Sequence, residues 1–211
     1  GDVVCVMLHN GTENAPRSDD ATTHPAMETC EFWVFGRGGD GPMAFQRSGQ
    51  HALAGGKFDA DLGDVTMEDT VVREIREETG LELDTGRVQH MPLPPRVRRV
   101  MEAASRRHIG VENAATLHLF AVQLVHGEAP DVFTSEHAHA HVSQMQLGVD
   151  RHMEEDGEDF LFPHNFVMVL HFMHALGMET RQTREVQAGS YPTVSLVTTS
   201  SGSENQDSDS Y

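Results

Sequence analysis

The stretch REIREETG, residues 73–80, places Glu74, Glu77 and Glu78 at positions i, i+3 and i+4. On a helix these positions are neighbours on one face, and like charges at that spacing destabilise the helix by a few tenths of a kcal/mol each. Two interpretations follow. The three carboxylates form a solvated acidic face, or they form a site for a hard cation such as Mg²⁺ or Mn²⁺, whose charge would relieve the repulsion.

The residues around this stretch predict a helix from about residue 67 to residue 79. Thr66 and Asp69 have the spacing of a capping box at its start. Gly80 stands where a left-handed glycine commonly ends a helix, and Leu81 supplies the hydrophobic contact that often follows. The inward-facing side chains of this helix would be Val71, Val72, Ile75 and Thr79.

The segment before this helix contains a double glycine, Gly55 and Gly56, followed by Lys57. Glycine lets the backbone approach a ligand closely, and a helix N-terminal region beside a carboxylate patch suits a metal-bound pyrophosphate. Arg73 precedes Glu77 by four residues and can brace it. This context favours the cation site over the solvated face.

Residues 55–81, GGKFDADLGDVTMEDTVVREIREETGL, resemble the signature of the Nudix hydrolases, G-x5-E-x7-R-E-U-x-E-E-x-G-U, in which U is aliphatic. The second half of the signature is filled at every specified position, by Arg73, Glu74, Ile75, Glu77, Glu78, Gly80 and Leu81. The first half departs from it, because Gly56 precedes Arg73 by 17 positions, three more than the pattern specifies, and Val65 stands at the glutamate position. We interpret this as a three-residue insertion before the helix, with Asp64 or Glu68 as the substitute carboxylate.

The resemblance implies hydrolysis of a nucleoside diphosphate that is linked to another group. It implies a catalytic set of Arg73, Glu74 and Glu77, in which Glu74, Glu77 and Glu78 hold Mg²⁺ or Mn²⁺ and Arg73 orients Glu77. The metal would neutralise the diphosphate and activate a water molecule. A carboxylate would take the proton, and the candidates are Glu74 or a glutamate from the loop after the long strand, Glu128 or Glu136. The expected substrate-binding residues are Gly55, Gly56, Lys57, Arg98 and Arg99.

The order of elements along the chain is typical of a mixed sheet flanked by helices, the α/β class. Strands are expected at residues 3–8, 30–37, 43–47 and 115–125, with an extended segment at 87–95, irregular structure or a short basic helix at 96–110, weak strands within 126–149 and an amphipathic helix at 162–176. The resemblance implies a Nudix-like α/β/α sandwich with a mixed β-sheet over residues 1–177, carrying a polar insertion at about 9–29. Residues 178–211 are expected to form a polar, flexible C-terminal tail.

The charge distribution is uneven. The formal net charge of −18 argues against a broad surface for nucleic acid or membrane. Six of the fifteen basic residues nevertheless lie in residues 87–107, namely Arg87, Arg96, Arg98, Arg99, Arg106 and Arg107. Arginine binds phosphate bidentately, so this cluster could bind substrate phosphates or an RNA backbone. A surface patch that offsets the acidic body, or a GC-rich genome, explains the cluster equally well.

Two further features have a structural interpretation that we favour. The aromatic residues of the stretch 32–35 are better explained by core packing than by stacking on a base. The alternate histidines His137, His139 and His141 favour a polar loop or an edge strand over a transition-metal site.

The cysteines and the hydropathy bear on the compartment. Cys5 and Cys30 could form one bridge at most, and a reduced compartment, the cytoplasm or an organelle such as the mitochondrion, is the simpler interpretation. No window approaches 18 consecutive apolar residues, so no transmembrane helix and no membrane partner are predicted.

Three functional hypotheses remain. The first is a metal-dependent pyrophosphohydrolase acting on a small nucleotide. The second moves the same chemistry to an RNA 5′ end, as a pyrophosphohydrolase or decapping activity, because of the arginine cluster. The third is a catalytically weak subunit that binds within an RNA–protein assembly, with a protein partner at the insertion 9–29 or at the tail 178–211.

Overall fold

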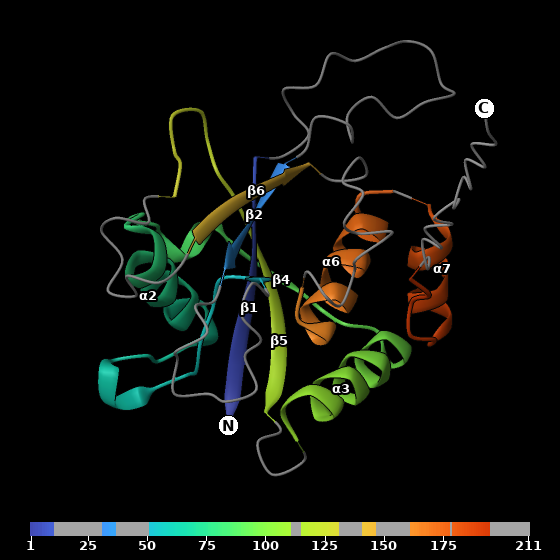
Figure 1. The fold of residues 1–211 in the computed structure, drawn as a ribbon. Coiled ribbons are helices and arrows are strands. Elements are labelled where there is room, and N and C mark those ends of the chain that lie inside the picture. The colour runs from blue at the N-terminus through green and yellow to red at the C-terminus, as the bar shows by residue number, and fades with distance from the viewer. Residues whose placement is uncertain are drawn as a thin grey trace, which may run out of the picture.

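A six-stranded mixed sheet forms the centre of the molecule (Figure 1). The computed structural model describes residues 1–10, 31–36, 51–110, 115–130, 141–146, 161–177 and 179–194, and the structural statements below concern these residues. The strands are β1 (Asp2–His9), β2 (Glu31–Gly36), β3 (His51–Ala52), β4 (Val88–Met91), β5 (Thr116–Gln123) and β6 (His141–Gln146). Their order is β3-β2-β1-β5-β4, with β6 paired to β2. Among the strands that the structure describes, only the β1–β5 pair is parallel, so the sheet is mixed.

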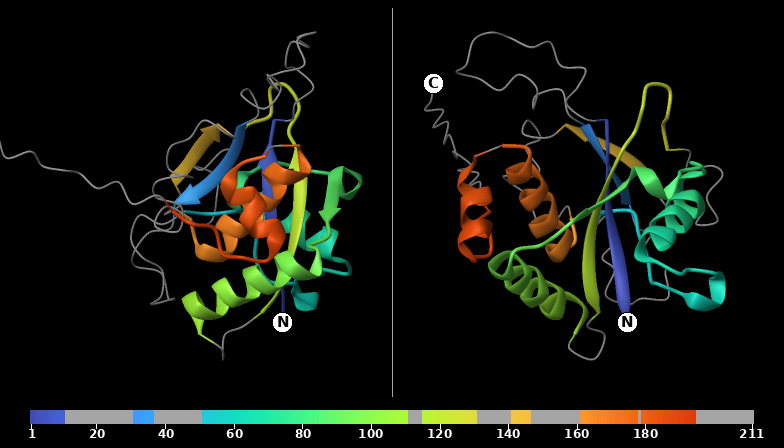
Figure 2. Two further views of the ribbon diagram at one scale, coloured as in Figure 1. Left: turned by 90° about the vertical axis from the view of Figure 1, so that its right-hand side faces the viewer. Right: turned by 180° about the vertical axis from the view of Figure 1, so that it is seen from behind.

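Helices cover both faces of this sheet. Helix α2 (Met67–Thr79) covers one face, and α3 (Pro95–Ile109), α6 (Pro163–Ala175) and α7 (Arg181–Ala188) cover the other (Figures 1 and 2). Two short 3-10 turns, Ala60–Leu62 and Thr85–Arg87, flank α2 in the sequence. The expected α/β/α sandwich is therefore confirmed.

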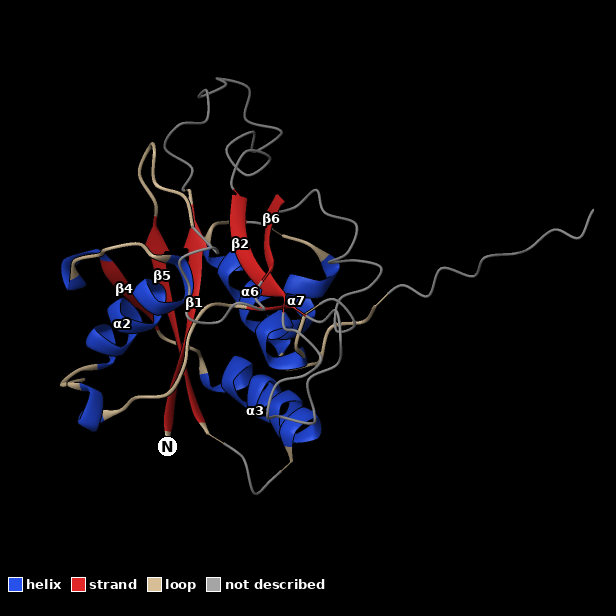
Figure 3. Ribbon diagram, turned by 60° about the vertical axis from the view of Figure 1, so that its left-hand side comes forward, coloured by secondary structure: helices blue, strands red, loops and turns tan. Residues whose placement is uncertain are grey.

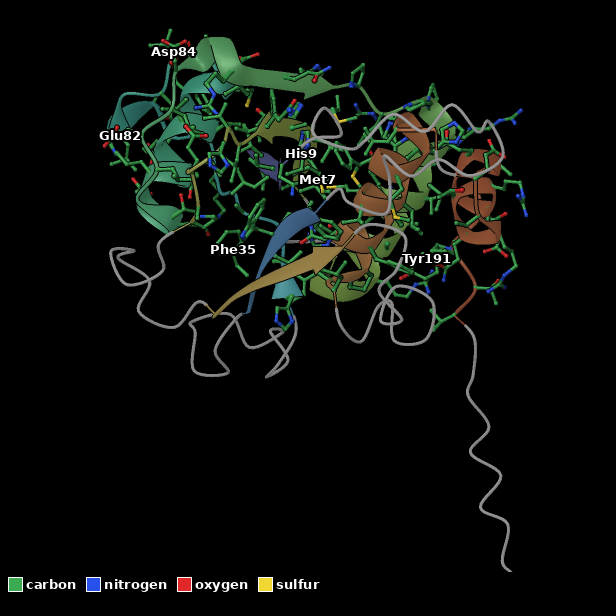
Figure 4. All side chains as sticks on the ribbon, turned by 90° about the horizontal axis from the view of Figure 1, so that it is seen from above. Met7, His9, Phe35, Glu82, Asp84 and Tyr191 are labelled. Atoms are coloured by element: carbon green, nitrogen blue, oxygen red, sulfur yellow. The ribbon has the colours of Figure 1, made fainter. Side chains whose placement is uncertain are left out.

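The alternation of side chains along β1 builds the two cores. Successive residues of a strand point to opposite faces. Val4, Val6 and Leu8 join the apolar cluster under α2, whereas Cys5 and Met7 join the cluster under α3, α6 and α7. Viewed from above, Met7 and His9 lie between Glu82 and Asp84, which follow α2, and Tyr191, which follows α7 (Figure 4). The sheet thus separates the two helical layers.

Helix α2 has the predicted bounds. Thr66 and Asp69 form the capping box, each side chain accepting from the other residue's backbone N–H. Gly80 ends the helix with φ +73°, the left-handed conformation that suits glycine. The inward positions Val71 and Ile75 are fully buried. The capping box and Gly80 therefore set the ends of α2, and the two buried apolar residues set the face that packs on the sheet.

Helix α6 is buried between the sheet and the helices α3 and α7. Nine consecutive residues, Asn165 to Met173, are buried, as expected for a helix that is apolar on nearly every side. Its one buried amide is satisfied, because the Asn165 Oδ1 accepts from the Leu53 N–H at 3.0 Å. The predicted helix at 162–176 is confirmed by Pro163–Ala175.

The structure differs from the sequence prediction at two places. Residues 96–110, expected to be irregular or a short basic helix, form most of the full-length α3. Residues 181–188, expected in a flexible tail, form α7, which packs on α3 and α6. Helix α7 was missed because its buried face has two polar residues, Gln182 and Thr183, beside Val186.

Several predictions fall outside the described residues. They include the strand at 43–47, nearly all of the insertion at 9–29, the histidines His137 and His139, and the tail beyond Val194. The aromatic stretch is described, and Phe32, Trp33 and Phe35 are buried, which confirms core packing. In the described part of the chain, no helix is long and apolar enough to cross a membrane.

The burial of Val186 predicts that α7 contributes to stability. Val186→Ala should lower the free energy of unfolding by about 1–3 kcal/mol, because it removes buried methyl groups and leaves a cavity. The control is Arg184→Ala on the exposed side of the same helix, which should change it by less than about 0.5 kcal/mol. Chemical denaturation measures both variants, and equal effects would contradict the packing of α7.

Candidate active site

Arg73 joins the loop before α2 to the carboxylates on that helix. Its Nε and Nη2 donate to the two carboxylate oxygens of Asp64 at 3.0 and 2.8 Å. Its Nη1 donates to Glu74 Oε1 at 2.8 Å and to Glu77 Oε2 at 3.2 Å. Its Nη2 also donates to the backbone carbonyl of Lys57 at 2.8 Å. A guanidinium has five N–H donors, and all five are used here.

Asp64 is the one of the two candidate substitute carboxylates that contacts Arg73. It is buried, and besides Arg73 its Oδ2 accepts from the Thr70 hydroxyl and from the Asp59 N–H, each at 3.0 Å. The hydrogen bonds from Arg73 lower the pKa of Asp64 to about 2. Val65 points outward with 83% exposure. The other candidate, Glu68, is not among the partners of Arg73, and the functional substitution by Asp64 stays a prediction.

The acidic patch is largely buried. Glu74 is 9% exposed and Glu78 is 3% exposed. The Glu74 carboxylate lies directly against Gly56, since a Cβ built on that glycine would lie 2.2 Å from Glu74 Oε1. Glu78 Oε2 accepts from the Gly55 N–H at 3.0 Å. The interpretation of a solvated acidic face is therefore wrong for these two residues, and Glu77, with a 27% exposed side chain, is the outermost of the three.

Burial changes the proton affinity of Glu74. Desolvation raises the pKa of Glu74 to about 7, and the charges of Glu78 and Glu77 act in the same direction. The guanidinium of Arg73 opposes the shift, but it is the smaller effect. Glu74 consequently exchanges its proton near neutral pH, whereas Asp64 stays ionised.

The chemistry of the three carboxylates fits a hard divalent cation, which prefers oxygen ligands. As arranged here, no three acidic, histidine or cysteine side chains of the described residues form a group that could hold a metal ion. Glu74 and Glu77 each direct an oxygen to Arg73, and Glu78 directs one to Gly55. Glu77 is the carboxylate with room to reorient, because its side chain is partly exposed.

The double glycine has a packing function in this structure. Gly55 has φ +143°, and a Cβ on it would lie 2.0 Å from the backbone oxygen of Val4. The segment then pairs with β1, since the Val4 N–H donates to the Gly56 carbonyl at 2.9 Å. The side chain of Lys57 is exposed, while its carbonyl is bound to Arg73. Contact of these residues with a substrate stays a prediction.

Two groups of predicted site residues do not join this cluster. Glu128 uses both carboxylate oxygens on Arg87, at 2.6 and 2.7 Å, and that ion pair lowers its pKa. Such a carboxylate anchors its loop and is poorly placed to accept a proton. Glu136 lies outside the described residues. Arg98 and Arg99 lie on α3, across the sheet from α2, so the structure does not bring them to the carboxylates (Figure 3).

A family comparison decides the classification. The model of the NUDIX domain matches residues 32–164, more than half of the chain. The chain belongs to the Nudix family. Nudix enzymes typically use divalent metals, which agrees with the oxygen ligands on α2. No curated protein sequence matches the chain.

Solved structures give only remote likenesses. The Trypanosoma brucei MERS1–RNA complex is 12% identical, covering 66% of this chain and 40% of that one, with a TM-score of 0.42. The NUDIX domain of Shewanella oneidensis NrtR with ADP ribose is 13% identical, covering 83% and 87%, with a TM-score of 0.48. A MutT/nudix family protein from Enterococcus faecalis is 15% identical, covering 88% and 67%, with a TM-score of 0.46. The chain thus spans less than half the length of the MERS1 chain.

The contact between Asp64 and Arg73 predicts a large stability effect. Asp64→Asn should lower the free energy of unfolding by about 3 kcal/mol, because the amide replaces one acceptor oxygen with an NH₂ donor and leaves a buried N–H of the Arg73 guanidinium without a partner. The control Val65→Glu should change it by less than about 0.5 kcal/mol, because that position is exposed. The folded-state pKa of Asp64 is depressed, so its contribution is present above the ordinary value of 3.8 and is lost as pH falls toward 2. Denaturant titrations at pH 7 and pH 3 measure this, and a deficit that persists undiminished at low pH would contradict it.

The raised pKa of Glu74 predicts an opposite pH dependence for the metal-free Nudix domain. The folded protein binds more protons than the unfolded chain between pH 4.5 and about 7, so stability falls as pH rises through that window. The slope from this group is at most about 1.4 kcal/mol per pH unit. Glu74→Gln should remove the slope and be more stable than the parent at pH 8. Thermal melts of the parent and of Glu74→Gln in a chelating buffer test this. A parent that gains stability relative to Glu74→Gln as the pH rises from 5 to 7 would contradict it.

Proposed function

We propose that this chain is a metal-dependent Nudix hydrolase that cleaves the pyrophosphate linkage of a nucleoside diphosphate derivative. The observation that carries the proposal is the burial of Glu74 and Glu78 beside the double glycine, organised by an Arg73 whose five donors are all used. Buried carboxylates without a cation are costly, so a site that keeps them supports a cation-dependent role.

The residues that would hold the metal are Glu74, Glu77 and Glu78. When bound, Mg²⁺ or Mn²⁺ supplies charge neutralisation for the diphosphate and lowers the pKa of a water molecule. The chain itself supplies orientation, because Arg73 fixes the carboxylates of Glu74 and Glu77 from one side. The exposed ammonium of Lys57 adds a positive charge at the rim for an anionic substrate.

Glu74 is the proposed general base. A base works best when its pKa lies near the working pH, and burial raises the pKa of Glu74 to about 7 in the protein without a bound cation. Glu128 is a weaker candidate, because its ion pair with Arg87 engages both oxygens. The proton of the attacking water would therefore pass to a carboxyl oxygen of Glu74.

A binding subunit is the second candidate function. Two observations favour it. Among the described residues, no three acidic, histidine or cysteine side chains come together in a group that could hold a metal ion. In addition, the position where the signature has glutamate is occupied by Val65, which faces solvent. In that case the fold would serve recognition inside an RNA–protein assembly. Its protein contacts would be made by the 9–29 insertion or by the C-terminal residues.

Turnover against a panel distinguishes these proposals. Purified protein with Mg²⁺ or Mn²⁺ should release phosphate-containing products from nucleoside diphosphate derivatives, and a triphosphorylated RNA in the panel tests the 5′-end activity. Glu77→Gln should lower kcat/KM by at least about 10²-fold. Glu68→Gln, a glutamate of the same helix outside the Arg73 network, should retain activity. A well-folded parent that turns over nothing in the panel would favour the binding subunit.

A further inference from the structure

Helix α3 carries a strongly basic outer face on an acidic protein. Its described residues include one glutamate, Glu102, and five arginines, namely Arg96, Arg98, Arg99, Arg106 and Arg107. The whole chain has a formal net charge of −18. Four of these arginines are exposed and Arg98 is half-buried. We name these five residues the α3 arginine face.

The arginines of this face are not used to hold the fold together by ion pairs. Within the described part of the chain, Arg96, Arg98 and Arg99 have no acidic partner within 4.0 Å. Arg106 pairs with Glu102 only at 3.6 Å, with its own side chain 51% exposed. Among the residues that the structure describes, the guanidinium groups of Arg96, Arg98 and Arg99 are therefore not engaged in ion pairs.

The position of these arginines costs stability. Arg96 and Arg98 lie in the first turn of α3, which has no acidic residue and no side-chain cap. Cations near a helix N-terminus are unfavourable, whereas anions are favourable there. A helix selected for stability alone would carry the opposite charges in this turn, so the arginines point to a bound anion.

The edges of the face are held by neighbouring residues. The Arg107 guanidinium lies over the Tyr191 ring, 5.5 Å from its centroid. The side chain of Arg96 lies beside Gly189 at the end of α7, where a Cβ would be 3.5 Å from the Arg96 Cβ. From Arg96 to Arg107 the helix rises roughly 16 Å. The positive charges thus form an ordered strip long enough for several phosphates.

The strip is separate from the carboxylates. Helix α2 packs on the core cluster that contains Val71 and Ile75, and α3 packs on the cluster that contains Val97 and Met101. The two helices lie on opposite sides of the sheet (Figure 3). The α3 arginine face therefore cannot bind the phosphates of a small substrate whose diphosphate lies at Glu74.

We infer that the α3 arginine face binds the phosphate backbone of a nucleic-acid strand, at a site distinct from the carboxylate site. Arginine rather than lysine suits this ligand, since its planar fork engages phosphate oxygens bidentately. A membrane surface fits less well, because the apolar side of α3 is buried in the core and offers nothing for insertion. The inference does not depend on the proposed hydrolysis.

Binding is tested with the full chain in a chelating buffer, so that hydrolysis has no part in the result. The probes are fluorescent 20-nucleotide single strands of RNA and DNA with one sequence, followed by anisotropy from 50 to 200 mM salt. Five phosphate contacts predict a log–log slope of about −3.5 for a single strand. The affinities for RNA and DNA should agree, because phosphate contacts alone do not distinguish them. A tenfold preference for either would overturn recognition through the backbone.

The matched variants are Arg99→Gln on α3 and Arg76→Gln on α2, both exposed arginines. Arg99→Gln should weaken binding about 3–10-fold and reduce the slope by about 0.7. Arg98→Gln/Arg99→Gln should weaken binding about 10–100-fold and reduce the slope by about 1.4, because independent effects add in free energy. Arg76→Gln should stay within about twofold of the parent. Neither of the two α3 variants should melt below the parent, which would show that loss of folding is not the cause.

Three results would overturn the inference. One is no binding of either strand at 50 mM salt. Another is equal weakening by Arg76→Gln and Arg99→Gln, which would indicate only a change of total charge. The last is competition by poly-glutamate, or capture by phosphatidylserine vesicles, at the same charge concentration as the nucleic acid.

Discussion

The guanidinium of Arg73 is the group on which the candidate site depends. It bonds to the Lys57 carbonyl, to Asp64 in the following loop, and to Glu74 and Glu77 on α2. One planar cation therefore fixes the distance between the glycine segment, the loop and the helix. Because every donor is used, moving any of the three segments leaves a buried N–H without a partner, which costs more than the bond itself contributes. The geometry of the carboxylates follows from this constraint.

The same constraint explains how two glutamates remain buried. Glu74 and Glu78 are packed beside the double glycine, where a side chain at Gly56 would occupy the space of the Glu74 carboxylate. The single positive charge of Arg73 cannot compensate the four carboxylates of Asp64, Glu74, Glu77 and Glu78 together. Desolvation raises the pKa of Glu74, and the neighbouring charges of Glu78 and Glu77 raise it further. A proton or a divalent cation has to supply the remaining charge. The valine at position 65, where the signature has glutamate, does not leave Arg73 without a carboxylate from this loop. Asp64, the residue before it, bonds to Arg73 instead.

Short-range sequence patterns predicted the features of the fold that depend on neighbouring residues. The bounds of α2, its capping box and Gly80 depend on contacts within a few residues, and the structure has them where the sequence placed them. The role of Asp64 was only one of two possibilities, since the path of a lengthened loop depends on where Lys57 lies against β1. Helix α7 was missed, because Gln182 and Thr183 are buried through hydrogen bonds rather than apolar character. The distance between Arg99 and the carboxylates was beyond sequence reasoning, because the sheet topology decides on which face each helix packs.

The separation of charge across the sheet has a consequence for ligand binding. On α2 the carboxylates outnumber the guanidinium of Arg73 that binds them, and on α3 five arginines accompany one glutamate. The two helices are held apart by β1 and β5 together with two apolar cores. If the opposite charges could meet they would neutralise each other, and neither face would retain affinity for an ion. The central sheet therefore preserves both unsatisfied surfaces in one domain, so a cation on α2 and a polyanion on α3 can be bound at the same time without competing for the same residues.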